Sequence, residues 1–273
     1  MIETPFFFPG KNYQLFGVLH QPKQNNINKG YVFCHPFGEE KLWAHRVYVN
    51  FARELSSKGY TVLRFDYMGY GDSDGTFEKT TVDNHINDIH NAIQEIQRQS
   101  QELESVGLLG LRFGATLACV AGSANNSIDN LILWDPVVDC NRYMQDLIRI
   151  NLTTQMAVYG KIIKSREDLI QTLMENGFIN IDGYDLSGVL YEGIAQLDLT
   201  DSIKALEKKS LIAQIGRPNQ KIRKEYAEII ENNDNLKISL VNEEPFWREI
   251  KKFYSIAPNL FSNTFEWLEG MND

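Results

Sequence analysis

The side chains that could act as a nucleophile or a general base are unevenly distributed along this chain of 273 residues. The five histidines all lie in its first third: His20, His35, His45, His85 and His90. The three cysteines are scattered: Cys34, Cys119 and Cys140. His35 directly follows Cys34, but adjacent residues of a strand point to opposite faces. These two side chains are therefore not expected to form a nucleophile–base pair.

A strand–turn–helix stretch frames the most informative position of the chain. The apolar run from Val106 predicts a buried strand, and the small and apolar residues after Arg112 predict a helix. The turn between them has glycines at its two ends, Gly110 and Gly114, where strand and helix approach too closely for a side chain. This is the spacing of G-x-S-x-G, the turn that exposes a nucleophilic serine. The serine position holds Arg112, which stays protonated in proteins and cannot attack.

Strands and helices alternate on both sides of this turn. The pattern predicts a mostly parallel sheet with helices on both faces, formed by residues 1–138 and 204–273. From Asp139 to about Ile203 the sequence is mostly helical and amphipathic, with Met144, Leu147 and Ile148 in a first apolar cluster. This stretch is too long for a simple connection, so we expect residues 139–203 to form a helical lid insertion.

These features together resemble the α/β-hydrolase superfamily over nearly the whole chain. The matching motifs are His-Pro-Phe-Gly at 35–38, Asp-x-x-Gly-x-Gly-x-Ser at 66–73, and the glycine frame of the turn at 110–114. Within the superfamily, the chain is similar to the exosortase-system-associated hydrolase-like branch, whose turn also looks degenerate. The motifs that carry this likeness are 110–115, Gly-Tyr-x-Leu at 183–186, and Glu-Pro-Phe-Trp at 244–247. The resemblance implies an α/β-hydrolase fold with a lid, in a biosynthetic or carbohydrate-export setting.

The resemblance also implies a Ser–acid–His triad, which this sequence lacks. The acid of the triad is expected after the seventh strand, but residues 216–220 contain no carboxylate, and only Asp135 could substitute for it. The histidine is expected after the eighth strand, but no histidine follows the turn at Arg112. Since nucleophile and base are both missing, a conventional triad is excluded. Catalysis by relocated groups leaves three candidates: His35, Cys34 and Asp135.

Arg112 needs a compensating negative charge. A cation at the beginning of a helix opposes the helix dipole, and an unpaired buried charge costs several kcal/mol. One compensation is an internal ion pair with Glu243, Glu244 or Asp135. The other is an anionic ligand, bound also by backbone N–H groups near Phe37 and Phe113, where an oxyanion hole would lie.

The expected ligand-binding residues are therefore Arg112, Phe113, Phe37, His35 and Glu244. Tyr184 and Tyr191 of the lid are expected in the roof of the pocket. The charged residues after the 35–38 motif, Glu39, Glu40, Lys41 and Arg46, are interpreted as solvated surface that could rim the pocket.

The leading hypothesis is a non-hydrolytic member of the superfamily. It would bind a small acyl, carboxylate or phosphorylated metabolite, or assist a biosynthetic partner protein. The alternative is an esterase, thioesterase or acyltransferase-like enzyme with relocated catalytic groups. Whether the chain is an enzyme stays open at this point, although conventional serine hydrolase activity is not expected.

The composition and motifs limit the classes of ligand, cofactor and partner that this chain is expected to bind. The net charge of −9, without a basic run, argues against nucleic-acid binding. Asp83, His85, Asp88 and His90 divide between the faces of a helix, so no metal site is expected. The glycines at 107–114 do not match the dinucleotide-binding motif, and no cofactor is expected. No membrane insertion is predicted, and the scattered cysteines with no signal peptide indicate the cytoplasm. A homo-oligomer is possible.

Overall fold

The computed structural model describes residues 1–175, 177–204, 206–230, 233–248 and 253–271. Its centre is an eight-stranded sheet in the order β1-β2-β4-β3-β5-β6-β9-β10. The strands are β1 (Ile2–Pro9), β2 (Gln14–Gln21), β3 (Lys29–Cys34), β4 (Thr61–Phe65), β5 (Ser105–Leu111), β6 (Ile128–Trp134), β9 (Lys209–Gly216) and β10 (Leu236–Asn242). β2 pairs antiparallel with β1 and β4, and the other neighbours are parallel. The expected α/β-hydrolase fold is confirmed.

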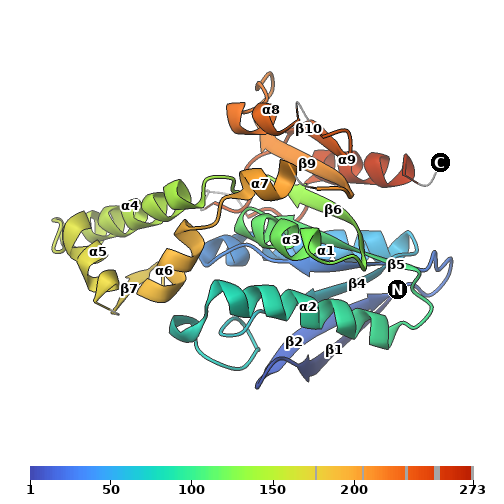
Figure 1. Cartoon of the computed structure of the whole chain (residues 1–273), viewed down its shortest axis with the longest axis horizontal. Helices are drawn as coiled ribbons and strands as arrows, with labels where there is room; N and C mark the ends of the chain where they lie inside the picture. The colour runs from blue at the N-terminus through green and yellow to red at the C-terminus, as the bar shows by residue number, and fades with distance from the viewer. Residues whose placement is uncertain (176, 205, 231–232, 249–252, 272–273) are drawn as a thin grey trace.

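Helices cover both faces of this sheet (Figure 1). Two of them, α2 (Val82–Gln99) and α3 (Phe113–Ser123), pack on one face, and α1 (Glu39–Ser57) and α9 (Pro258–Glu269) pack on the other. The short helix α8 (Lys224–Ile230) joins β9 to β10, and the 3-10 helix η1 (Phe77–Lys79) precedes α2. Among the described residues, no helix is long and apolar enough to cross a bilayer.

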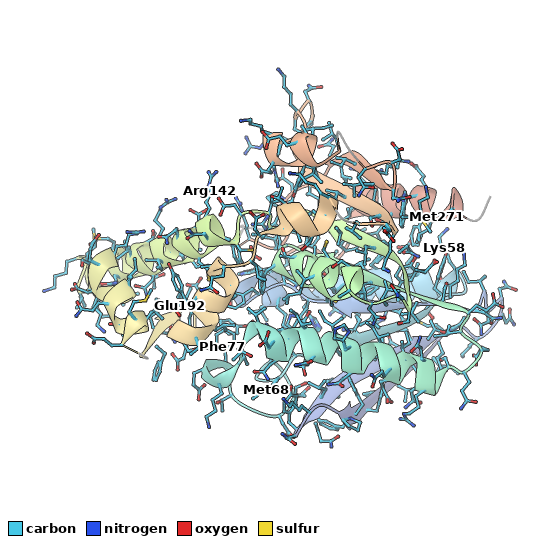
Figure 2. All side chains as sticks on the ribbon, viewed as in Figure 1. Lys58, Met68, Phe77, Arg142, Glu192 and Met271 are labelled. Atoms are coloured by element: carbon cyan, nitrogen blue, oxygen red, sulfur yellow. The ribbon has the colours of Figure 1, made fainter. Side chains whose placement is uncertain are left out.

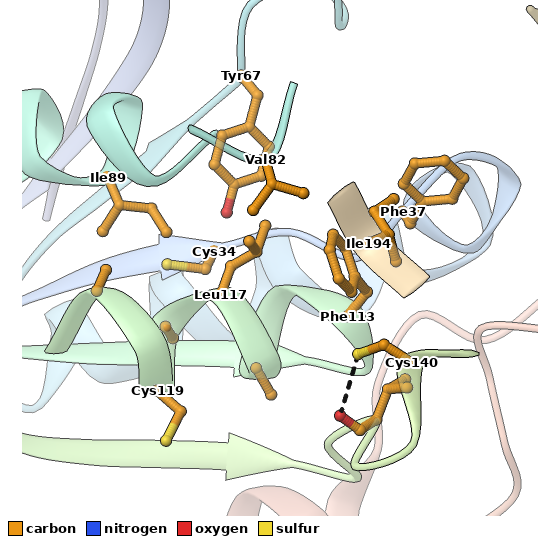
Figure 3. Packing of buried hydrophobic residues seen from close by; sticks show 14 of the residues in the cluster. Cys34, Phe37, Tyr67, Val82, Ile89, Phe113, Leu117, Cys119, Cys140 and Ile194 are labelled. Atoms are coloured by element: carbon orange, nitrogen blue, oxygen red, sulfur yellow. Dashed lines mark hydrogen bonds between the residues drawn. The ribbon is translucent and has the colours of Figure 1, made fainter. Parts of the chain in front are cut away.

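The sheet separates two apolar cores, and alternation along the strands assigns each side chain to one of them. In β4, Leu63 contributes to the core under α2 and α3, whereas Val62 contributes to the core under α1 and α9. In the second core, Trp134 packs edge-to-face on Phe51, with ring centroids 4.8 Å apart. Figure 3 shows part of the first core, with Cys34 pointing from β3 into the layer beneath α2.

Most of the segment between β6 and β9, residues 139–203, projects beyond one end of the sheet (Figure 1), while its last part packs on α3. Its helices are α4 (Cys140–Tyr159), α5 (Arg166–Met174), α6 (Gly188–Ala195) and α7 (Leu199–Lys204). It also contains an antiparallel hairpin, β7 (Phe178–Ile181) and β8 (Tyr184–Ser187), which the mostly helical expectation missed. The turn of this hairpin is Asp182-Gly183, with φ angles of 49° and 92°. We call residues 139–203 the inserted segment.

The inserted segment meets the core near η1 and the beginning of α2. Phe77 of η1 packs edge-on against Tyr184 of β8, with ring centroids 5.1 Å apart. Figure 2 places Phe77 at this junction, whereas Arg142 and Glu192 lie on the outer surfaces of α4 and α6. The aromatic contact therefore fixes one edge of the inserted segment against the sheet domain.

Two helices begin at other residues than the sequence predicts. The spacing of Val47, Phe51 and Leu55 predicts a helix from about Ala44, but α1 begins at Glu39, because Glu39 and Glu40 in its first turn interact favourably with the helix dipole. The sequence also predicts a C-terminal helical region from about Pro245 to Leu268, whereas the helix α9 begins at Pro258, a residue favoured at the first helical position. Residues 249–252 of the predicted C-terminal helical region lie outside the described part of the chain.

Candidate functional site

The turn between β5 and α3 has the backbone of a nucleophile elbow. Arg112 is the N-cap residue of α3, with φ 54° and ψ −124°, a conformation that non-glycine residues rarely adopt. A Cβ on Gly110 would lie 2.4 Å from the carbonyl oxygen of Gly114, and one on Gly114 would lie 2.3 Å from that of Cys34. The glycine frame is therefore required by the close approach of α3 to β5 and β3.

The Arg112 side chain is largely buried, with 14% of its surface exposed, and it contacts two carboxylates. Its Nη1 lies 3.1 Å from Asp135 Oδ2, and its Nε lies 3.4 Å from Glu40 Oε1. Nη1 also donates to the Asp135 carbonyl oxygen at 3.3 Å. Burial lowers the pKa of Arg112, but Glu40 and Asp135 outweigh it and raise that pKa above its usual value.

Asp135 is the centre of this charge arrangement. It follows β6 with φ 46°, and its side chain is 1% exposed. Oδ2 accepts from Arg112, while Oδ1 accepts from Arg223 Nη2 at 2.8 Å and from the Ile215 backbone N–H at 3.1 Å. The carboxylate therefore bridges two guanidinium groups and the end of β9. Arg223 was not anticipated from the sequence, since it lies in the irregular stretch before α8.

Glu40 is the second partner, in the first turn of α1. Its Oε2 accepts a hydrogen bond from the Tyr143 hydroxyl of α4 at 3.0 Å. Burial raises the pKa of the Glu40 carboxyl, while Arg112 and Tyr143 act in the opposite direction. The interpretation of Glu40 as ordinary solvated surface is wrong. Its side chain is only 18% exposed, because α1 begins five residues earlier than predicted and turns it toward the elbow.

Of the three carboxylates expected beside Arg112, Asp135 is present and the two glutamates are not. Glu243 accepts a hydrogen bond from the Asn259 backbone N–H at 3.1 Å, and Glu244 is exposed. In the part of the chain that the structure describes, neither forms an ion pair with Arg112. The loop after β10 instead places Trp247 beside Arg112, whose guanidinium carbon lies 5.4 Å from the ring centroid.

A pocket of about 670 Å³ lies above Arg112. The sheet domain contributes residues of the turn before α1, the beginning of α1, the elbow and the loop after β10: Phe37, Gly38, Glu39, Glu40, Trp43, Arg112, Trp247 and Arg248. The inserted segment contributes residues of α4 and of the β7–β8 hairpin: Tyr143, Asp146, Leu147, Ile150, Thr153, Thr154, Ile181, Asp182 and Tyr184. We call this cavity the elbow pocket. Tyr184 lines it as predicted, whereas the Tyr191 hydroxyl accepts a hydrogen bond from Gln145 away from the lining.

The two phenylalanines predicted near an oxyanion hole adjoin one another. The Phe37 and Phe113 rings meet edge-to-face with centroids 6.0 Å apart. Figure 3 labels both residues at this end of the first core. Among the described residues, neither backbone N–H donates a hydrogen bond to a protein acceptor. Phe37 lines the elbow pocket, while the Phe113 ring is buried and stacks on Tyr143. The backbone elements of an anion-binding turn are therefore retained.

The three residues considered as alternative catalytic groups, His35, Cys34 and Asp135, do not line the elbow pocket. The His35 ring is buried, its Nδ1 lies 2.8 Å from the Pro36 carbonyl oxygen, and its Nε2 accepts from the Tyr67 N–H at 3.4 Å. Burial lowers the pKa of His35 well below its usual value. Cys34 is fully buried, and burial raises the pKa of its thiol to about 12. Both side chains thus have the environment of structural residues.

No cluster of metal-binding side chains occurs among the described residues. The four acidic and imidazole groups of α2 divide between its faces, since Asp83 is exposed whereas His85 and Asp88 are buried. Asp88 accepts from the Tyr13 hydroxyl and from the Met68 N–H. These hydrogen bonds assign Asp88 to the packing of α2 on the loop after β4.

Comparisons with known proteins agree with the fold. The family described as serine aminopeptidase, S33, matches residues 28–179, more than half of the chain. Among curated proteins, none is detectably similar in sequence.

Solved structures of esterases and peptidases superpose on nearly the whole chain. Est1E from Butyrivibrio proteoclasticus, determined with ferulic acid bound, is 16% identical with a TM-score of 0.67, covering 97% of this chain and 99% of its own. The Pyrococcus furiosus esterase Pf2001 is 18% identical with a TM-score of 0.67, covering 98% and 91%. A proline iminopeptidase from Mycobacterium smegmatis is 14% identical with a TM-score of 0.57, covering 86% and 89%. At these identities the likeness establishes the fold alone.

Proposed function

The chain belongs to the S33 serine aminopeptidase family, and within it we propose a protein that binds a small acyl ligand in the elbow pocket without cleaving it at the elbow. One observation carries this proposal. The nucleophile position holds a guanidinium group that is already paired with Asp135 and Glu40. Arginine has no nucleophilic form in proteins, and its two carboxylate partners hold it in place.

The lining of the elbow pocket favours a neutral acyl group over a phosphorylated one. Aromatic side chains from both parts of the structure, Phe37, Trp43, Tyr143, Tyr184 and Trp247, supply most of its large surfaces. Four carboxylates, Glu39, Glu40, Asp146 and Asp182, outnumber the two arginines, Arg112 and Arg248. Since the carboxylates would repel a phosphate and Arg112 is already occupied, an apolar chain with a hydrogen-bonding end group fits best.

In this proposal, the N–H groups of Phe37 and Phe113 orient the carbonyl oxygen of the ligand. The inserted segment acts as a lid, with Leu147, Ile150 and Tyr184 facing the acyl chain. A biosynthetic partner protein, as the similarity to the exosortase-associated branch suggests, would deliver or receive the ligand. A cytoplasmic location and a homo-oligomeric state belong to the same proposal.

A hydrolase with relocated catalytic groups is the second candidate, and membership of a peptidase family favours it. Esterases among the structural neighbours favour it as well. In the elbow pocket the best-placed general base is Glu40, because its carboxyl is largely buried and has a raised pKa. Glu40 would take a proton from a water molecule that attacks an acyl carbonyl bound by the N–H groups of Phe37 and Phe113. The ester C–O or thioester C–S bond would then break, and the proton on Glu40 would pass to the leaving alcohol or thiol. Cys34, His35 and Asp135 are less suitable, since none of them lines the elbow pocket.

One set of measurements separates the two candidates. Wild-type protein is assayed with ester and thioester substrates of graded chain length, and binding of neutral fatty amides is measured by calorimetry. We expect amide binding without turnover. Ile150→Trp, which fills the pocket, should abolish binding, and Val158→Trp, at an exposed position on the same helix outside the lining, should preserve it.

Turnover in the wild type would instead support the hydrolase. Loss of that turnover in Glu40→Gln would assign the base to Glu40, and loss in His35→Ala would assign it to His35. A fluorophosphonate probe should leave the wild type unlabelled. Stoichiometric labelling of any serine, including Ser73, would contradict both candidates, because each assumes that no activated serine exists.

A further inference from the structure

A second cavity, of about 430 Å³, lies between α1 and the strands β2 and β4. It shares no lining residue with the elbow pocket. Much of its wall is apolar, from Phe16 and Val18 of β2, Phe33 of β3 and Phe65 of β4. We call it the Arg64 cavity, after the charged residue that distinguishes it.

Arg64 lies in the middle of the sheet on the α1 side. It stands opposite Val18 of β2 and Phe33 of β3, and it alternates along β4 with Leu63 and Phe65, which face the other core. Its Nε donates to His20 Nε2 at 3.0 Å. Among the described residues, no carboxylate lies within ion-pair distance of this guanidinium, and its Nη1 and Nη2 have no hydrogen-bond partner.

The nearby carboxylates are committed to other cations. Glu3 forms a two-point contact with Arg53, at 2.6 and 3.0 Å, and also contacts His20. Asp66 lies 2.6 Å from Lys41 Nζ. The Lys41–Asp66 pair lines the Arg64 cavity, and the two charges of this pair neutralise each other. Because Glu3 and Asp66 both pair with other cations, Arg64 contributes a positive charge that no ion pair offsets. Burial lowers the pKa of Arg64 to about 10, although the charges of Glu3 and Asp66 act in the opposite direction.

We propose that the Arg64 cavity binds a small monocarboxylic acid with an apolar body. Its carboxylate would accept hydrogen bonds from Nη1 and Nη2 of Arg64. Its aliphatic or aromatic body would pack against Phe16, Val18 and Phe33. The planar guanidinium presents its N–H groups at the spacing of the two oxygens of a carboxylate, which explains the choice of functional group.

The charge balance of the cavity selects a monoanion. A phosphate dianion requires at least two uncompensated cations, but Lys41 is neutralised by Asp66, and Asp72 adds a further carboxylate at the rim. His45 also lines the cavity, and burial together with the charge of Arg64 lowers its pKa, so it stays neutral at pH 7. A single carboxylate therefore matches Arg64, the one cationic side chain of the described lining that forms no ion pair. This proposal does not rest on the function of the elbow pocket.

Calorimetry with the full chain tests the proposal, with benzoate as the probe and benzamide as its neutral counterpart. We expect benzoate to bind and benzamide to bind at least tenfold more weakly. Arg64→Gln should weaken benzoate binding at least tenfold, and Arg64→Lys should weaken it less, since it keeps the charge and loses the two-point contact. Val18→Phe, which fills the cavity without altering Arg64, should also abolish binding.

Arg112→Gln is the matched control, because it removes the guanidinium of the elbow pocket and leaves the Arg64 cavity intact. Benzoate affinity should be unchanged in this variant. Loss of binding in Arg112→Gln with retention in Arg64→Gln would place the carboxylate at the elbow and overturn the proposal. Equal binding of benzoate and benzamide, or displacement of benzoate by equimolar inorganic phosphate, would overturn it as well.

Discussion

Arg112 and Asp135 directly follow the neighbouring strands β5 and β6, both with the positive φ angles that are uncommon for non-glycine residues, 54° and 46°, and an ion pair of 3.1 Å joins their side chains. Backbone hydrogen bonds also hold both residues against the neighbouring strand. The Arg112 N–H donates to the Trp134 carbonyl oxygen of β6, and the Asp135 N–H donates to the Ala213 carbonyl oxygen of β9. The charge pair thus lies across the edge of the sheet where β5 and β6 end. Arg112 therefore contributes to stability as well as to the shape of the pocket.

Replacing Arg112 with alanine should destabilise the fold. The change leaves Glu40 and Asp135, two largely buried carboxylates, without a shared cation. Breaking a buried pair costs about 3–5 kcal/mol, and we expect about 3 kcal/mol because Arg223 still neutralises Asp135. Urea unfolding measures the loss. Arg149→Ala, which removes an exposed pair with Asp146, should cost less than about 1 kcal/mol. Equal losses in the two variants would contradict this assignment.

Restoring serine at the elbow should not restore hydrolysis. Arg112→Ser would occupy a backbone position that suits a nucleophile, but no histidine follows it in the sequence. Ester turnover by the variant should equal that of the wild type, and the variant should be less stable for the same reason as Arg112→Ala. A fluorophosphonate adduct on the new serine would reveal a base that the described contacts do not show.

A methyl group at Gly114 should be harmful because its neighbours are backbone atoms. The new Cβ would lie 2.3 Å from the Cys34 carbonyl oxygen and 2.4 Å from that of His35. Gly114→Ala should therefore cost about 3 kcal/mol or more, since β3 and α3 must separate. Gly160→Ala is the control, because a Cβ added there would have none of the neighbouring atoms considered within 4 Å, while the backbone has φ 68°. It should cost only the backbone penalty of about 1–2 kcal/mol. Thermal unfolding ranks the two variants.

Asp88 should make stability fall as the pH rises. Burial raises the pKa of its carboxyl to about 6, whereas the unfolded chain has an ordinary value of about 4. Between these values the native state binds the proton more tightly, so stability is highest below about pH 4 and declines toward pH 6.

Asp88→Asn removes this dependence while keeping an acceptor for the Tyr13 hydroxyl. Relative to the wild type, the variant should therefore gain on the order of 2 kcal/mol between pH 4 and pH 7. Urea unfolding at both pH values measures the gain, because the other titrating groups cancel in the comparison. A constant difference between the two proteins would exclude Asp88 as the source.

The sequence was sufficient to predict the sheet domain, since its strands are apolar runs and its turns are marked by glycines. The ion pair of Arg112 with Asp135 was also predictable, because consecutive parallel strands place their following residues at one edge of the sheet. Glu40 was not, since its role depends on where α1 begins and on the Tyr143 hydroxyl from a distant helix. Such a contact is set by packing between the sheet domain and the inserted segment.

The hairpin in the inserted segment was missed although the sequence contained a signal for it. Asp182-Gly183 is a favoured two-residue turn, and alternating burial precedes it in β7. The strands are only four residues each, which is too short for alternation to outweigh the helical pattern around them. The Arg64 cavity was unpredictable for another reason, because a charged residue within an apolar strand does not reveal whether its partner is internal.

The turn between β5 and α3 has the backbone shape of a nucleophile elbow with an arginine at residue 112, because the glycine contacts and the ladder between β5 and β6 hold the turn irrespective of that side chain. Backbone shape and the identity of residue 112 are thus separable at this turn. A serine–histidine mechanism here would need a serine at 112 and a histidine in the loop after β10, and we expect neither change alone to confer activity. The first change would also remove the ion pair with Asp135. The two substitutions would therefore have to occur together, because the first one alone would lower stability without adding a base.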